Sequence, residues 1–441
     1  MDTGAMGQMF HAYEPDQALL LPPSLRDWLP DDHPAHFISD TVDELDLSAF
    51  LRKYEEREDG RGQLAYHPGL MLKVLIYAYS IGLFSSRRIA AAIEEQVALR
   101  YLTAGNFPSH RTIARFRLDH LADFQTLFVE VVRIAQASGM VKLGTLAVDG
   151  TKLKANASKH KAMSYGRMKE EEKRLREEIK KITDLARRTD EAEDAEFGPD
   201  FRGDELPEEL RRRKDRLATI RAAKKRLEAE QAEEDEKSGR GTSERGPRLK
   251  RDNGVPEDKA QSNFTDPESR IMKSASGAFE QSYNAQIAVD SGEQIIVAAD
   301  VTACAADSGE LLKMEAAATA NLGQHPKELL ADAGYKSEAN FVELEERGVQ
   351  AFVSLGRGEA LPDQVAEDKP GTRRMARRLR TKRGRKRYRL RKTVVEPVFG
   401  WIKQVAGFRG FLLRGIQKVR GEWALVCMAM NLKRMGRSLT W

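Results

Sequence analysis

The most constraining feature of this chain of 441 residues is a short apolar run that ends on a carboxylate. Residues 146–148 read Leu-Ala-Val, as a buried strand requires, and Asp149 and Gly150 follow directly. The same pattern recurs at 328–331, where Glu-Leu-Leu-Ala is followed by Asp332. An Asp-Gly pair commonly forms only a turn, so one occurrence decides nothing. Two apolar runs that each end on an aspartate predict strands that carry carboxylates to the edge of a sheet.

The segments around these runs predict a mixed α/β sheet flanked by helices. The expected elements are, in chain order, a hairpin of strands at 283–289 and 295–299, a helix at 308–322 capped by Asp307 or Ser308, a helix at 341–347, a strand at 350–355 and a buried helix at 423–432. Counting the two runs above as strands, the first strand, at 146–148, and the fourth, at 328–331, lie side by side in this order. Asp149 and Asp332 then meet at adjoining strand ends.

Two neighbouring carboxylates point to metal chemistry. They cannot both ionise cheaply unless a cation lies between them, and hard divalent ions with oxygen ligands are the usual solution. Two such ions about 4 Å apart activate one oxygen and stabilise the departing one in an in-line phosphoryl displacement. Asp149 and Asp332 therefore predict a phosphoryl-transfer site with two metal ions.

Glu396 is the expected third acid of such a site. It falls in the apolar segment 394–402, where an isolated carboxylate is costly without a charge partner. The alternative is an acid in the first turn of a helix, with Pro397 at the first helical position. The rival acids are Asp290, Asp300, Asp307 and Glu338. Asp290 and Asp307 fit a turn and a cap better, and Asp300 ends the return strand of the hairpin, farther from the site.

The charges of the chain are segregated although the net charge is only +5. Lys and Arg crowd into 373–392 and 409–437, whereas acids dominate 190–209. Separated positive charge favours a polyanionic partner such as nucleic acid. The two cysteines, Cys304 and Cys427, are isolated and support neither a disulfide framework nor a zinc site. Without an apolar window of about 18 residues or a signal-peptide pattern, we expect a cytoplasmic protein with no membrane partner.

Residues 1–140 predict an all-α amino-terminal domain that binds DNA. A helix at 109–120, capped by Ser109, carries Arg111, Arg115 and Arg117 near its start. Exposed arginines at a helix start are typical of a helix-turn-helix reader of DNA. Ordinary all-α packing with a solvated basic face explains the same residues, so both interpretations stay open.

Residues 160–265 predict an insertion that protrudes from the central domain. Apolar residues recur at heptad-like spacing on both sides of a polar tip, which indicates two antiparallel helices. Both helices contain too few apolar residues for a core of their own. The polar stretch 239–258 is expected to be a flexible return. The catalytic domain would then consist of 141–159 and 266–441.

Three motifs resemble those of a known family. Ala147-Val-Asp-Gly-Thr-Lys, Leu330-Ala-Asp-Ala-Gly-Tyr and Val395-Glu-Pro-Val-Phe-Gly-Trp-Ile-Lys look like the acid motifs of the DDE transposases of bacterial insertion sequences. Phe408-Arg-Gly-Phe-Leu-Leu-Arg-Gly and Gly421-Glu-Trp-Ala-Leu-Val-Cys resemble the carboxyl-terminal part of the same group. The resemblance runs from about residue 65 to the end of the chain.

This resemblance implies a ribonuclease H-like catalytic domain that cleaves and joins DNA at the ends of a mobile element. Asp149, Asp332 and Glu396 are then the catalytic residues and the ligands of two Mg²⁺ ions, for which Mn²⁺ would substitute. The implied partners are double-stranded DNA, at the element's ends and at the target, and further copies of the chain in a homodimer or larger assembly on DNA.

Six basic residues are the expected DNA contacts: Lys152, Lys154, Arg111, Arg115, Lys392 and Lys403. Related transposases carry a Tyr-x2-Arg-x3-Glu-x6-Lys pattern, in which Lys392 takes the Arg place and Lys403 the last position, whereas Tyr388 is one residue out of step. Trp401 would stack on an unpaired base or belong to the core. Two other functions remain open, a catalytically inactive DNA-binding regulator and a ribonuclease H-like nuclease without joining activity.

Overall fold

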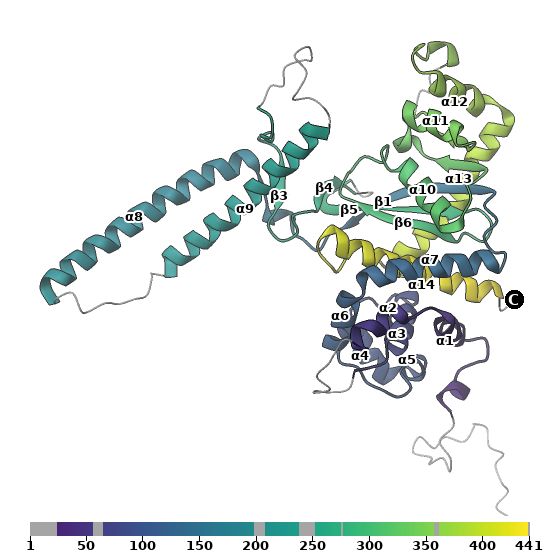
Figure 1. Ribbon diagram of the computed structural model, residues 1–441, viewed down its shortest axis with the longest axis horizontal. Helices are drawn as coiled ribbons and strands as arrows, with labels where there is room; N and C mark the ends of the chain where they lie inside the picture. The colour runs from purple at the N-terminus through teal and green to yellow at the C-terminus, as the bar shows by residue number, and fades with distance from the viewer. Residues whose placement is uncertain are drawn as a thin grey trace, which may run out of the picture.

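The fold is centred on a six-stranded mixed sheet, seen in a computed structural model that describes residues 24–55, 65–197, 208–237, 252–274, 277–356 and 361–439. The strand order is β4-β5-β1-β7-β8, with β6 paired to β5 (Figure 1). β1 is antiparallel to β5 and parallel to β7, as the prediction of a mixed sheet requires. The strands of the sheet are β1 (Thr145–Lys154), β4 (Arg270–Lys273), β5 (Phe279–Asp290), β6 (Ile296–Thr302), β7 (Glu328–Ala331) and β8 (Gln350–Val353).

The pairing of β1 with β7 places the two aspartates side by side. Ala147 lies opposite Leu330 in the parallel register, and Asp149 and Asp332 each lie two residues further along the chain. The predicted adjacency of the first and fourth strands is confirmed.

β1 does not end at Asp149, so that expectation was wrong. The strand continues antiparallel to β5 as far as Lys154, with Gly150 opposite Gln286. A Cβ atom at residue 150 would lie 2.3 Å from Nε2 of Gln286, so the Gln286 side chain occupies the space that a glycine leaves. The Asp-Gly pair is therefore part of a strand and not a turn.

Six helices of the described chain pack on the sheet, and two of them, α11 and α12, contact β8. α13 contacts β1, β7 and β8, α10 contacts β5 and β6, and α14 contacts β6 together with α7. The largest fully buried side chain, Trp423 of α14, donates its indole N–H to the carbonyl of Gln286 at 3.1 Å. The six helices are α7 (Leu121–Ala137), α10 (Leu311–Leu322), α11 (Glu338–Glu346), α12 (Pro370–Arg380), α13 (Lys382–Gly400) and α14 (Ile416–Leu439).

The amino-terminal helices form a layer below α7 and α14 in Figure 1. Ser109 caps α6 as predicted, accepting from the Thr112 amide at 3.2 Å. Arg117 is buried and donates to the Tyr79 hydroxyl and the Phe84 carbonyl, both at 2.9 Å, so its expected place on an exposed basic face was wrong. The helices are α1 (Pro34–Glu44), α2 (Ser48–Glu55), α3 (Pro68–Ser80), α4 (Ser86–Glu95), α5 (Val97–Leu102) and α6 (His110–Asp119).

The insertion is a pair of long helices that extends away from the body (Figure 1). The helices α8 (Tyr165–Phe197) and α9 (Glu208–Lys237) connect to the sheet through a small ladder of β2 (Ala162–Ser164) and β3 (Gln261–Asn263). Contrary to expectation, the pair has an apolar cluster of its own, which includes Met168, Leu175 and Ile220. Most of the polar return predicted at 239–258 lies outside the described residues, which resume at 252.

The remaining elements are short. They are η1 (Leu25–Trp28), η2 (Lys159–Lys161), η3 (Ala333–Tyr335), η4 (Pro362–Gln364) and η5 (Trp401–Val405), of which η5 is a π-helix and the others are 3₁₀ turns. Among the described residues, no helix has the length and apolar character needed to cross a membrane.

Candidate active site

Asp149 is a mostly buried carboxylate held from two sides. Its Oδ2 atom accepts from Arg391 of α13 at 2.8 Å, and its Oδ1 atom accepts from the Gly150 amide at 2.9 Å. Burial raises the pKa of Asp149 to about 6, with Arg391 lowering that pKa and the charges of Asp332 and Asp307 raising it. At neutral pH the site thus holds a desolvated anion that gains from any further positive charge.

Asp332 follows β7 directly and caps the short turn η3. Its Oδ1 atom accepts from the Gly334 amide at 2.8 Å. The carboxylate is close enough to Asp149 to raise the pKa of that residue. Two of the three predicted acids are therefore neighbours, as the strand order required.

Glu396 lies in the interior of α13 and is solvent-exposed. The alternative interpretation, an acid at a helix start with Pro397 first, was wrong because α13 begins at Lys382. Pro397 has no N–H to donate to the carbonyl of Thr393, and that carbonyl instead accepts from Nε2 of Gln294 at 2.9 Å. Within the described ranges, no three His, Cys, Asp or Glu side chains are grouped closely enough to hold one metal ion. The structure therefore brings the helix of Glu396, rather than its carboxylate, to the aspartates.

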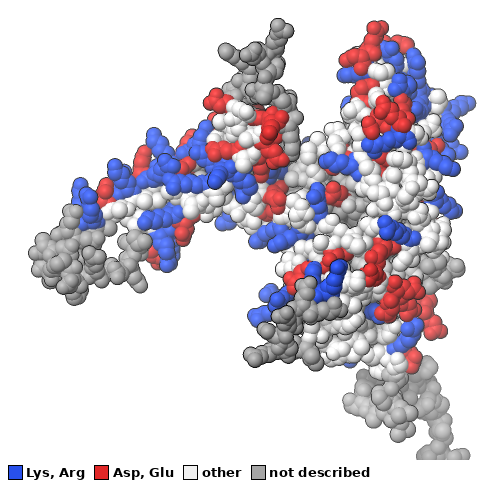
Figure 2. Space-filling model, viewed as in Figure 1, with Lys and Arg blue, Asp and Glu red and all other residues white. Residues whose placement is uncertain are grey.

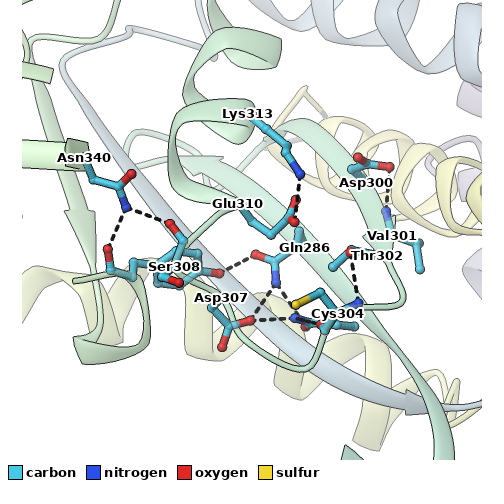
Figure 3. A network of polar contacts seen from close by, with 12 residues as sticks. Gln286, Asp300, Val301, Thr302, Cys304, Asp307, Ser308, Glu310, Lys313 and Asn340 are labelled. Carbon is cyan, nitrogen blue, oxygen red and sulfur yellow. Dashed lines mark hydrogen bonds and ion pairs between the residues drawn. The ribbon is translucent and has the colours of Figure 1, made fainter. Parts of the chain in front are cut away.

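Asp307 is not a helix cap, contrary to prediction. The N-cap of α10 is Glu310, and the Oδ1 atom of Asp307 accepts three hydrogen bonds instead. The donors are Nζ of Lys152 at 3.0 Å, Nδ2 of Asn284 at 2.6 Å and Nε2 of Gln286 at 3.0 Å, and Figure 3 shows Asp307 beside Gln286. This acid belongs to a polar network on the other face of β1 from the side chain of Asp149, because residues 149 and 152 alternate along the strand.

The other rival acids have structural partners. Asp290 is fully buried in the hairpin turn, as predicted, and accepts from the amides of Leu143 at 3.0 Å and Gly292 at 2.9 Å. Asp300 forms an ion pair with Arg420 at 2.8 Å. Glu338 accepts from the amides of Gly371 and Thr372 at the start of α12. None of these three carboxylates is among the charges that shift the pKa of Asp149.

Arg391 is a residue that the sequence argument missed. The family pattern was counted back from Glu396, which assigned the arginine place to the exposed Lys392. Counted forward from Tyr388, the Tyr-x2-Arg spacing ends on Arg391. Burial works to lower the pKa of Arg391, but the charge of Asp149 and the neighbouring acids raise it. The spacing from Tyr388 is therefore the sequence signal that identifies Arg391.

The six predicted DNA contacts fall into three settings. Lys152 is engaged with Asp307, and its side chain is only 18 % exposed. Lys403, on η5, donates to the hydroxyl of Thr151, and burial lowers its pKa while the charge of Asp149 acts to raise it. The exposed members are Lys392, Arg111, Arg115, which pairs with Asp119 at 3.5 Å, and Lys154, which pairs with Glu280 at 3.4 Å. Trp401 is half-buried, with Nζ of Lys433 4.7 Å from its ring centre.

A basic cavity of about 620 Å³ lies at the far end of β1, where the insertion begins. Four cationic side chains and one carboxylate line it, together with an aromatic ring that is 61 % exposed: Lys154, Lys159, Lys161, Arg414, Glu280 and Phe279. Lysine and arginine also gather along the α8–α9 pair and around α12 and α13 (Figure 2). The sheet thus carries one acid, Asp149, in the middle of β1 and cations at the end of that strand.

Two family models match the chain. The Transposase domain (DUF772) matches residues 23–119, and the Transposase DDE domain matches residues 252–432, a range that includes Asp332 and Glu396. The chain is a DDE transposase of the insertion-sequence type. Its α/β fold, with the helical region before it and the helical insertion, is consistent with a ribonuclease H-like architecture. Neither the curated proteins nor the solved structures contain a match to this chain.

Proposed function

We propose that this transposase binds the ends of its insertion element and uses divalent metal ions to cleave DNA strands and join them to target DNA. The observation that carries the proposal is the parallel pairing of β1 and β7, which sets Asp149 beside Asp332. Family membership supports DNA as the substrate, and the cationic surfaces fit that substrate.

The residues suit a divalent cation. Asp149 and Asp332 are neighbouring carboxylates, and the first of them is desolvated and held by a single guanidinium. We assign these two residues and Glu396 as the ligands of Mg²⁺ or Mn²⁺. When bound, such ions would polarise the phosphodiester and raise the nucleophilicity of the attacking oxygen.

The protein's own groups prepare this site. Arg391 fixes the Asp149 carboxylate from α13, so it acts as a positioning residue. Lys403 presents an ammonium close to Thr151 and Asp149, where it can neutralise a phosphate of the bound strand. Glu396 reaches the aspartates if its helix shifts or its side chain reorients when DNA and metal bind. We therefore expect a large part of the site to form on assembly.

DNA binding is assigned to the basic surfaces around the sheet. The cavity at the end of β1 presents Lys154, Lys159 and Lys161, and Phe279 offers a face on which a base can stack. Lys392, Arg111 and Arg115 are assigned to the flanks of the same DNA. We propose residues 1–140 as the DNA-binding domain, 141–159 and 266–441 as the catalytic domain, and 160–265 as an insertion that contacts DNA or a second copy of the chain.

The proposed chemistry is tested with Asp149→Asn, Asp332→Asn and Glu396→Gln on DNA carrying the element's ends. Each variant should lose at least about a thousandfold in strand cleavage in Mg²⁺ while its DNA affinity, measured by gel shift, stays near wild type. Asp300→Asn removes one charge elsewhere on the sheet and is the matched control. Cleavage by any of the three variants at the wild-type rate would remove that residue from the site.

The same assay separates the other functions. Wild-type protein that binds ends without cutting them would be a regulator. Protein that nicks DNA but fails to join pre-cut ends to a target would be a nuclease.

The proposed DNA surface is tested with the double variant Lys159→Glu/Lys161→Glu. We expect weaker DNA binding and a shallower dependence of log affinity on log salt, by about 2, because two phosphate contacts are lost. Lys180→Glu/Lys181→Glu on α8 makes the same change of charge on exposed residues away from the cavity. Equal losses in both double variants would contradict a specific role for the cavity.

A further inference from the structure

The loop 408–415 contributes Arg414 to the basic cavity at the end of β1, and the proposed function gives this loop no role. The amide of Phe411 donates to the carbonyl of Lys154 at 2.8 Å, and the amide of Lys154 donates to the carbonyl of Arg409 at 3.3 Å. A Cβ atom at Gly410 would lie 2.9 Å from the Lys154 carbonyl oxygen, so this close approach requires a glycine. The loop therefore lies directly against the last residue of β1.

The exposed side chain of Arg414 is held in place by the protein itself. Its Nε atom donates to the carbonyl of Asn156 at 2.9 Å, and Nδ2 of Asn156 donates to the carbonyl of Leu412 at 2.6 Å. The loop is anchored by Glu422, which is fully buried and accepts from the amides of Leu412 and Leu413, both at 3.1 Å. The guanidinium is thus positioned at the cavity before any ligand binds.

Phe279, the first residue of β5, is the aromatic residue of the same cavity. A single exposed ring needs no ligand by itself, but this one shares its cavity with four cations. They are Lys154, Lys159, Lys161 and Arg414. The carboxylate in the lining, Glu280, pairs with Lys154 at 3.4 Å, which leaves the cavity with an excess of positive charge around an apolar ring.

A second basic cavity, of about 410 Å³ on α13, shows what the ring adds. Four cations line it as well, together with one aliphatic and one hydroxyl side chain: Lys382, Arg385, Lys386, Arg389, Leu390 and Thr393. Cations alone bind the phosphates of any DNA, paired or unpaired. An aromatic face among the cations favours a strand without a partner, because a double helix keeps the faces of its bases inside the stack.

We propose that the cavity at the end of β1 binds an unpaired stretch of DNA. One base stacks on Phe279, and the neighbouring phosphates contact Arg414, Lys159 and Lys161. The inference rests on the proposed function, which makes DNA the substrate, and it narrows the ligand of this cavity to single-stranded DNA. Residue 154 follows Asp149 on β1 at a distance of about 17 Å along the strand. A strand end freed at the acids therefore has this cavity within reach.

The test measures the affinity of the full-length protein for labelled oligothymidylate and for a labelled duplex of the same length, by fluorescence anisotropy. Phe279→Ala should bind the oligothymidylate about tenfold more weakly, because one stacked base is lost, and should bind the duplex within about twofold of wild type. Phe279→Trp keeps a ring and should bind the oligothymidylate at least as tightly as wild type. Ile271→Ala removes another exposed apolar side chain, from the neighbouring strand β4, and should leave both affinities unchanged.

The phosphate contact is tested separately with Arg414→Gln. This variant should bind the oligothymidylate more weakly, and its dependence of log affinity on log salt should be shallower by about 0.7, because one phosphate contact to a single strand is lost. Arg409→Gln removes the same charge from an exposed position of the same loop and should keep the wild-type slope. Equal slopes in the two variants would contradict the assignment of Arg414.

Equal losses on both DNAs in Phe279→Ala, or wild-type affinity of that variant for the oligothymidylate, would overturn the inference and leave the proposed function standing. A wild-type protein that neither binds nor cleaves DNA would overturn both. If Phe279→Ala does not fold, the wild-type protein is mixed with an oligothymidylate that carries one 2-aminopurine, a base whose fluorescence falls when it stacks. Quenching in the wild type that is lost in Phe279→Leu supports the inference, and equal or absent quenching in the two proteins contradicts it.

Discussion

Ion pairs between acids and arginines are buried in the middle of the sheet and exposed on the α8–α9 pair. At the sheet, Asp149 and Arg391 form one ion pair whose side chains are 17 % and 12 % exposed. On the helical pair, ion pairs such as that of Glu208 with Arg212 leave 63 % and 76 % of the side chains exposed. The buried ion pair at the sheet therefore has a large interaction energy, whereas each exposed ion pair on the two helices contributes little.

Burial decides how much stability the fold loses when a charged side chain is removed. An exposed pair is solvated whether or not it forms, so its loss changes little. A buried acid that loses its partner keeps its desolvation cost, and the structure must shift, take up a proton or bind a cation. The sheet site thus depends on positive charge in a way that the helical pair does not.

The largest stability effect is expected for Arg391→Ala. Removing the guanidinium takes away the charge that lowers the pKa of Asp149, so at pH 8 this buried carboxyl group either stays charged without a cationic partner or takes up a proton. The protein should lose about 3 kcal/mol of unfolding free energy in the absence of metal. Urea denaturation followed by tryptophan fluorescence measures the loss. Arg389→Ala, on the exposed side of the same helix, should be close to wild type. Equal stabilities of the two variants would show that the ion pair is no stronger than an exposed one.

A smaller effect of opposite sign is expected for Asp149→Asn. The pKa of Asp149 is about 6 in the folded protein against the usual 3.8, so stability falls as the pH rises through this window, where only the folded state keeps the proton. Removing the acid should stabilise the metal-free protein by about 1–2 kcal/mol at pH 8.

Below pH 4 the two proteins should have the same stability, since both the folded and the unfolded forms of Asp149 are then protonated. The check is urea denaturation at pH 8 and pH 3.5. Lower stability of Asp149→Asn at pH 8 would mean that Arg391 more than compensates the buried charge.

The smallest effects belong to the helical pair. Glu172 is the exception there, since its side chain is 9 % exposed and accepts from Arg221 at 3.0 Å and Lys224 at 3.2 Å across the two helices. Glu172→Gln should destabilise the pair by about 1 kcal/mol, and Arg212→Ala by less than about 0.5 kcal/mol. Amide hydrogen exchange in α9 measures both. A larger loss of stability in Arg212→Ala than in Glu172→Gln would contradict the expectation that buried charges matter more than exposed ones.

The sheet order was predictable because apolar runs and turn residues are local signals. The hairpin of β5 and β6 and the neighbouring strands β1 and β7 followed from them, and the neighbouring strands placed Asp149 next to Asp332. The extent of β1 was not predictable from Asp149 and Gly150 alone. It depends on Gln286 of another strand, which needs the space at position 150.

The partners of the site were the least predictable part. Arg391 contacts an acid 242 positions earlier in the chain, and no local pattern ties the two together. Asp307 stands just before a helix, where a cap is the natural expectation, and only the contacts with Lys152 and Asn284 show another role. The sequence did not indicate that Pro397 lies inside a helix, because proline is common at helix starts. The Thr393 carbonyl, which lacks an N–H donor from Pro397, accepts instead from Gln294 of a distant turn.

The short ladder of β2 and β3 has a consequence for how this transposase can diversify. Both chain segments that connect the long helices to the body pass through it, so the place where the chain leaves the sheet adjoins the place where it returns. The length and charge of α8 and α9 can therefore change without moving β1 and β7, the strands that position Asp149 and Asp332.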